Sequence, residues 1–174
     1  MNIWLLSAWF LACSPLRLQK RLDDQEFDHW YALRVYMTDE QKKSYLKKKT
    51  REERDAYLQS ENLWDNFYKY EERIRDKIVD GEVQIGWTLD MLQMSWGRPY
   101  DQQMAIGRQA VRSVKYVYKF ELHEKTNKEG QLQQNILLWE PNSKTVYKAN
   151  KCFKQEIIVD DDVIAEMEQK DMPC

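Results

Sequence analysis

The stretch GWTLDMLQMSWGRP, residues 86–99, decides the fold because it contains the start, the apolar face and the end of one helix. Thr88 is a residue type that caps helices, and Gly97 suits the left-handed backbone that follows a helix. Pro99 then prevents the helix from continuing, so we predict a short helix over 89–96. Three of its apolar residues fall on one face: Leu89, Leu92 and Trp96.

The residues after this helix change to an alternating pattern. Over 114–121, apolar or aromatic residues alternate with largely polar ones, which predicts a strand. Further strands are expected over 131–140, 145–149 and 153–159, with turns at 126–130 and 141–144. We expect residues 160–170 to be helical, because three aspartates at 160–162 would lie in the first turn, where the helix dipole favours acidic side chains.

The part of the chain before residue 86 is predicted to be largely helical. Thr38 and Gln41, and likewise Thr50 and Glu53, have the spacing of capping boxes, so a short helix should follow each threonine. The longest helical pattern covers residues 63–80, where apolar residues recur at steps of three and four before Gly81. This stripe consists of Leu63, Phe67, Tyr70, Ile74 and Ile78. Together the elements predict an α+β fold, with N-terminal helices followed by a short capped helix and a three- to four-stranded antiparallel meander.

Composition and charge limit the classes of function. The chain has 174 residues, of which 43% are hydrophobic and 32% charged, and this suits one domain with appendages. A formal net charge of −2 gives no general attraction to nucleic acid. Only 5 glycines and 4 prolines are present, so no long disordered linker is expected.

The N-terminal segment differs from the rest of the chain. Residues 3–12, IWLLSAWFLA, are uncharged and mostly apolar. A helix of this length spans about 15 Å, which is too short to cross a membrane but matches the apolar region of a secretory signal peptide. The segment ends in Leu11-Ala12-Cys13-Ser14, which resembles the lipobox of bacterial lipoproteins. That resemblance implies that Cys13 carries fatty acyl chains such as palmitate, and Ser14 favours sorting to the outer membrane. The alternative is a buried N-terminal helix with an ordinary core cysteine.

The two other cysteines, Cys152 and Cys174, form an even pair that suits an oxidising compartment. A disulfide between them would close a loop of about 23 residues and contribute roughly 3 kcal/mol to stability. The alternative is that both remain free thiols.

The motif at residues 86–99 resembles the signature of the BamE-like (SmpA/OmlA) outer-membrane lipoprotein domain. In that family a glycine, a bulky residue and a threonine open a short helix that ends in Gly-x-Pro, and a tyrosine-bearing strand follows. The likeness covers about residues 74–148. It departs from a minimal member in its helical extension and in Trp87, where methionine is common. The resemblance implies a non-enzymatic module that binds other envelope proteins, often in outer-membrane assembly or integrity.

This interpretation divides the chain into five parts: a signal peptide (1–12), a lipidated tether (13–22), a helical extension (23–80), the BamE-like domain (81–159) and a C-terminal helix and tail (160–174). Trp87, Arg98 and Tyr100 are the candidate partner contacts, because they flank the helix. The expected location is the periplasmic face of the outer membrane. Two alternatives remain: a periplasmic inhibitor-like binding protein, or a hydrolase whose site is not recognisable from sequence.

Signals for catalysis or metal binding are weak. His29 and His123 lie far apart in sequence and have no partner at metal-ligand spacing, so we expect no metal site. The chain contains neither a Gly-x-Ser-x-Gly motif nor a phosphate-binding loop, and no cofactor is expected. The lysine-rich residues 42–51 are flanked by acidic residues and are interpreted as the solvated face of two helices rather than as a lipid-binding patch.

Overall fold

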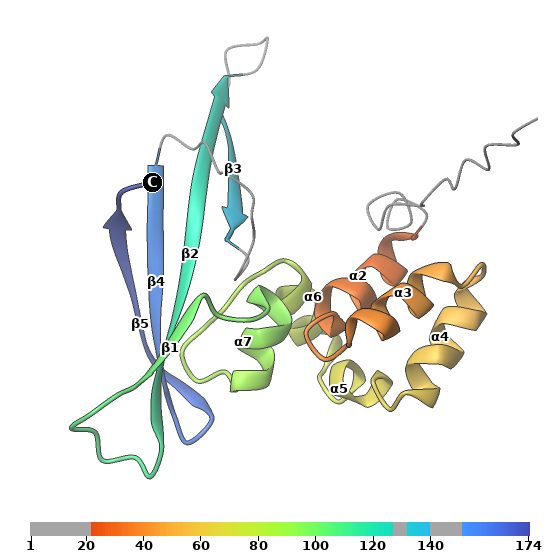
Figure 1. Ribbon diagram of the computed structural model, residues 1–174, viewed down its shortest axis with the longest axis horizontal. Helices are drawn as coiled ribbons and strands as arrows, with labels where there is room; N and C mark the ends of the chain where they lie inside the picture. The colour runs from red at the N-terminus through yellow and green to blue at the C-terminus, as the bar shows by residue number, and fades with distance from the viewer. Residues whose placement is uncertain (1–21, 127–131, 140–150) are drawn as a thin grey trace, which may run out of the picture.

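The computed structural model describes residues 22–126, 132–139 and 151–174, and in this part of the chain the helices precede an antiparallel sheet (Figure 1). The helices are α2 (Asp24–Leu33), α3 (Asp39–Lys47), α4 (Arg51–Ser60), α5 (Trp64–Tyr68), α6 (Glu72–Val79) and α7 (Leu89–Trp96). The strands are β1 (Asp101–Met104), β2 (Ser113–Thr126), β3 (Leu132–Leu138), β4 (Lys151–Asp160) and β5 (Val163–Met172). The predicted α+β fold is confirmed. The expected signal peptide, Cys13, most of the tether, and the predicted turn at 141–144 and strand at 145–149 lie outside the described residues.

Side-chain caps set the starts of the first three helices. Asp23 and Glu26 form a reciprocal capping box at α2, and Thr38 and Gln41 form another at α3. At α4 the Thr50 hydroxyl accepts a hydrogen bond from the Glu53 N–H at 3.3 Å. The carboxylate of Glu53 instead accepts from the Lys49 N–H, so this second predicted box is only half formed. Each cap satisfies helix N–H groups that have no partner within the helix.

The predicted single helix over 63–80 is wrong, because the chain breaks it into α5 and α6. Glu71 has an extended backbone at φ −61° and ψ 152°, and the carbonyl of Tyr70 accepts a hydrogen bond from the Arg75 guanidinium at 2.7 Å. The same guanidinium lies over the Tyr68 ring. The predicted apolar stripe still faces the core on both sides of the break, which is why its periodicity concealed the break.

Strand β2 is the centre of the sheet. It pairs with β4 along one side, and on its other side with β1 and then β3, one after the other. β5 pairs with β4, so the order across the sheet is β1-β2-β4-β5, with β3 beside the far half of β2. All pairings are antiparallel. Sequence analysis did not predict β1, a four-residue strand without alternating hydrophobicity.

The expected helix over 160–170 is wrong. Asp161 and Asp162 have positive φ angles of 47° and 67° and form the tight turn between β4 and β5. Aspartate tolerates this left-handed backbone better than most residues, and two such residues in succession suit a β-hairpin turn. The aspartates that were interpreted as a first helical turn therefore form a hairpin turn.

Helix α7 connects the helical region to the sheet. Its bounds are those predicted, with Thr88 accepting a hydrogen bond from the Met91 N–H at 3.4 Å and Gly97 at φ 76°. The Trp96 ring meets Tyr118 and Phe120 of β2 edge-on, with centroids 5.2 and 5.1 Å away. On its other side α7 contacts α2 and α6. One apolar core therefore includes residues of the helices and of the sheet.

Candidate functional site

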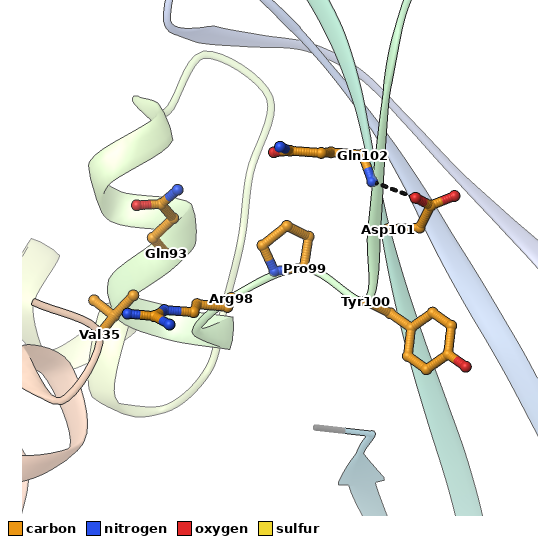
Figure 2. A pocket seen from close by; sticks show the side chains of 7 residues that line it. All are labelled: Val35, Gln93, Arg98, Pro99, Tyr100, Asp101 and Gln102. Carbon is orange, nitrogen blue, oxygen red and sulfur yellow. Dashed lines mark hydrogen bonds between the residues drawn. The ribbon is translucent and has the colours of Figure 1, made fainter. Parts of the chain in front are cut away.

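An open depression of about 490 Å³ lies beside β1, where the chain leaves α7 (Figure 2). It is lined by Val35, Gln93, Arg98, Pro99, Tyr100, Asp101 and Gln102. Pro99 turns the chain from the end of α7 into β1, so the motif that ends the helix also forms the floor of this site. We call the depression and the outer edge of β1 together the β1 groove.

Three polar side chains in the β1 groove are available to a ligand. Arg98 is exposed, and no acidic side chain of the described residues pairs with it. The amides of Gln93 and Gln102 extend toward the groove from α7 and β1 (Figure 2) and make no side-chain hydrogen bond within the described part of the chain. The groove therefore offers one guanidinium and two amides that can form hydrogen bonds with a bound molecule.

The outer edge of β1 is open. All four β1 residues are exposed, and of the described strands only β2 pairs with it. The carboxylate of Asp101 accepts hydrogen bonds from the Gln102 N–H at 2.8 Å and from the Gln103 amide at 2.9 Å. The Asp101 carboxylate therefore covers the Gln102 N–H, and a carbonyl of an added strand would have to displace it. A short strand with such an edge can accept a further strand.

Exposed aliphatic side chains continue this edge into the β1–β2 loop. Met104 is 69% exposed and Ile106 is 95% exposed, which is unusual for side chains of this size. The loop is braced nonetheless: Arg108 donates to the carboxylates of Asp160 and Glu166, and the carboxylate of Asp161 accepts from two N–H groups of the loop. The loop thus presents apolar side chains to solvent on a fixed backbone.

Tyr100, Lys119 and Trp139 form an aromatic cluster outside the β1 groove. The Tyr100 ring points away from the groove (Figure 2) and meets Trp139 with centroids 6.2 Å apart. The ammonium group of Lys119 lies 3.7 Å from the centre of the Tyr100 ring, a cation–π contact that holds the tyrosine in place.

Of the three predicted partner contacts, the structure brings two together. Arg98 and Tyr100 are both lining residues of the depression, but the Tyr100 ring points away from it (Figure 2), so only the Arg98 side chain faces a ligand there. Trp87 is only 7% exposed and belongs to the core, so it offers little surface to a partner. Sequence analysis missed Gln93 and Gln102, and no sequence signal distinguishes them from other surface glutamines.

The predicted cysteine pair is joined. Cys152 of β4 and Cys174 form a disulfide with their Cα atoms 5.2 Å apart, which ties the C-terminal residue to the sheet. Cys13, the predicted lipidation site, lies outside the described residues.

The two histidines lie beside carboxylates but away from the β1 groove. His29 is fully buried, with Nε2 2.6 Å from the Tyr68 hydroxyl and Nδ1 3.6 Å from Asp55, and this burial lowers its pKa to about 4. His123 lies 2.9 Å from the buried carboxylate of Glu121. Within the described ranges, no group of three or more His, Cys, Asp and Glu side chains is arranged to hold a metal ion. In the same ranges no helix is long and apolar enough to cross a membrane.

Comparison with known proteins gives no relative for this chain: no family model, curated protein or solved structure matches it.

Proposed function

We propose that this chain is a non-enzymatic, protein-binding lipoprotein of the bacterial envelope, held by Cys13 at the periplasmic face of the outer membrane. The lipobox-like sequence supports the anchor, and the BamE-like motif at residues 86–99 supports a role as a binding or scaffold module in outer-membrane assembly or integrity. The disulfide between Cys152 and Cys174 is in keeping with an oxidising compartment.

The observation that carries the binding role is the β1 groove. It combines an open strand edge with an adjoining depression in which Arg98 has no acidic partner among the described residues. A segment of a partner added to β1 would gain main-chain hydrogen bonds from the edge, and the depression would receive its side chains. We therefore assign the β1 groove as the contact surface for an envelope protein.

The anchor is tested by mass spectrometry of the mature N-terminus together with membrane fractionation. We expect a diacylglyceryl group on Cys13 and recovery in the outer membrane, and a Cys13→Ser variant should lose both. An intact Met1 in the cellular protein would contradict the anchor.

The contact surface is tested by placing a photo-crosslinking amino acid at Gln102 in cells. The control position is Gln59, an exposed residue on α4 at the other end of the molecule (Figure 1). We expect one discrete protein adduct from position 102 and none from position 59. Equal adducts from both positions, or none from either, would contradict the assignment. If the adduct contains a soluble enzyme that the purified chain inhibits, the chain is an inhibitor rather than a scaffold.

A further inference from the structure

We infer that the β1 groove selects an extended segment that carries a carboxylate at one end and an aliphatic side chain about six residues away. This inference rests on the proposed function and names the chemistry of its partner. Three features carry it: the open edge of β1, the Arg98 guanidinium at one end, with which no acidic side chain of the described residues pairs, and Met104 with Ile106 at the other end.

The open edge requires an extended partner. β1 and β2 are paired from Asp101 to Met104, and the pairing continues through the Ala105 N–H, which donates to the Ser113 carbonyl at 3.0 Å. The other edge of β1 therefore faces solvent over a length of four residues, with the Gln102 N–H covered by the Asp101 carboxylate. Main-chain pairing at such an edge is independent of the partner's sequence, so selectivity has to come from side chains.

Arg98 selects for a carboxylate. The acidic residue that lies closest in sequence, Asp101, already accepts two hydrogen bonds from Gln102 and Gln103. A guanidinium forms its strongest hydrogen bonds with a carboxylate, and the amides of Gln93 and Gln102 can orient a neighbouring peptide group. The tether of this same chain is an unsuitable occupant because its charged residues, Arg17, Lys20 and Arg21, are all basic. The partner is therefore an acidic segment of another protein.

Met104 and Ile106 select for an aliphatic side chain. Both project from the end of β1 that is remote from Arg98, and the braced loop beyond them keeps them in that place. The chain covers at most about 20 Å between residues 98 and 104, since an extended residue spans about 3.3 Å. An aliphatic side chain of the partner would remove apolar surface of both residues from water, which favours binding.

The test is a selection of random eight-residue peptides displayed on phage against the purified full-length chain. The expected result is enrichment of peptides with Asp or Glu near one end and Val, Ile or Leu near the other. The affinity of the most enriched peptide, labelled with fluorescein, is then measured by anisotropy for the wild type and three variants.

Arg98→Glu and Ile106→Asp should each weaken binding by about tenfold or more, because the first reverses the charge and the second removes the apolar contact. Arg73→Glu is the matched control: Arg73 is exposed on α6, a helix that contributes no residue to the lining of the depression, so binding should change less than about twofold. No enriched peptide, enriched peptides without an acidic residue, or equal effects of the two arginine variants would overturn the inference. So would a dimer formed through β1, detected by light scattering and abolished by Ile106→Asp.

Failure of the inference is distinguishable from failure of the proposed function. If the cellular adduct at Gln102 persists unchanged in Arg98→Glu and Ile106→Asp, the surface binds a partner but does not select it in this way. If no adduct forms in the wild type, the proposed function itself fails.

Discussion

Protonation of His29 should destabilise the fold as the pH falls. The imidazole is fully buried among Trp64, Phe67 and Tyr68, and burial, assisted by the nearby Arg51 guanidinium, lowers its pKa from 6.5 to about 4. In the unfolded chain the ring takes up a proton below pH 6.5, whereas the folded chain resists protonation until about pH 4. The stabilising effect of the neutral ring is therefore complete above pH 6.5 and is lost between pH 6.5 and 4.

The size of the effect follows from this interval. At about 1.4 kcal/mol per pH unit, the drop from 6.5 to about 4 corresponds to a loss of about 3 kcal/mol, of which about 2 kcal/mol falls between pH 7 and 5. Asp55 acts in the opposite direction, because burial raises its pKa above the ordinary value of 3.8. The comparison of the wild type with a variant that lacks His29 therefore isolates the contribution of this ring.

The assay is urea denaturation followed by tryptophan fluorescence at pH 7, 6 and 5, for the wild type and for His29→Gln. The glutamine cannot take up a proton, so the free energy of unfolding of the variant should lose about 2 kcal/mol less over this range. If the wild type and His29→Gln have the same pH dependence, the reasoning from burial is refuted.

Three other substitutions test separate parts of the fold, each by urea denaturation at pH 7. Cys174→Ser removes the disulfide to Cys152 and should lower the free energy of unfolding by about 3 kcal/mol, an effect that a reducing agent should reproduce in the wild type and not in the variant. Gly97→Ala places a Cβ on a backbone at φ 76° and should lower the free energy of unfolding by about 1–2 kcal/mol through backbone strain. Gly107→Ala, at φ 82°, should have a similar effect, because the Arg34 guanidinium 3.5 Å from the Gly97 Cβ position is an ordinary contact. Arg54→Met leaves the carboxylate of Glu26 buried without its cation and should lower the free energy of unfolding by about 3–5 kcal/mol. The double variant Arg54→Met with Glu26→Leu should recover most of this loss, and a double variant as unstable as Arg54→Met alone would contradict the reasoning.

Sequence reasoning succeeded where one local rule decided the structure. Helix α7 has the predicted bounds because Thr88, Gly97 and Pro99 each act on the adjacent backbone, independently of the rest of the fold. Strand β2 was recognised from its alternation, although it extends to Thr126, five residues beyond the predicted end at 121. In both elements the pattern and the tertiary contacts agree.

The wrong predictions arose where tertiary contacts or turn geometry outweighed periodicity. The break at Glu71 contains neither glycine nor proline. The Arg75 side chain of α6 donates a hydrogen bond to the Tyr70 carbonyl, which the break leaves without a helical partner. The three aspartates at 160–162 suited the first turn of a helix, but Asp161 and Asp162 have positive φ angles and form the turn of a β-hairpin. Strand β1 has no pattern of its own and is held by pairing with β2.

The candidate site was predicted only in part. Arg98 and Tyr100 were chosen because they flank the helix, and both are lining residues of the depression. Trp87 was chosen for the same reason, but its large apolar ring is packed in the core. Gln93 and Gln102 come from different elements, and only the folded chain brings them to one groove.

The position of α7 between the helices and the sheet constrains how this protein can vary. Leu92 and Met94 are wholly buried in a core that both regions share. A version of the chain without α2 to α6 would expose that apolar surface to water, so the helical region cannot be deleted without destabilising the sheet region. Insertions should instead be tolerated beside Ile106 in the β1–β2 loop, where the side chain is exposed, provided that the contacts of Arg108 with Asp160 and Glu166 are kept.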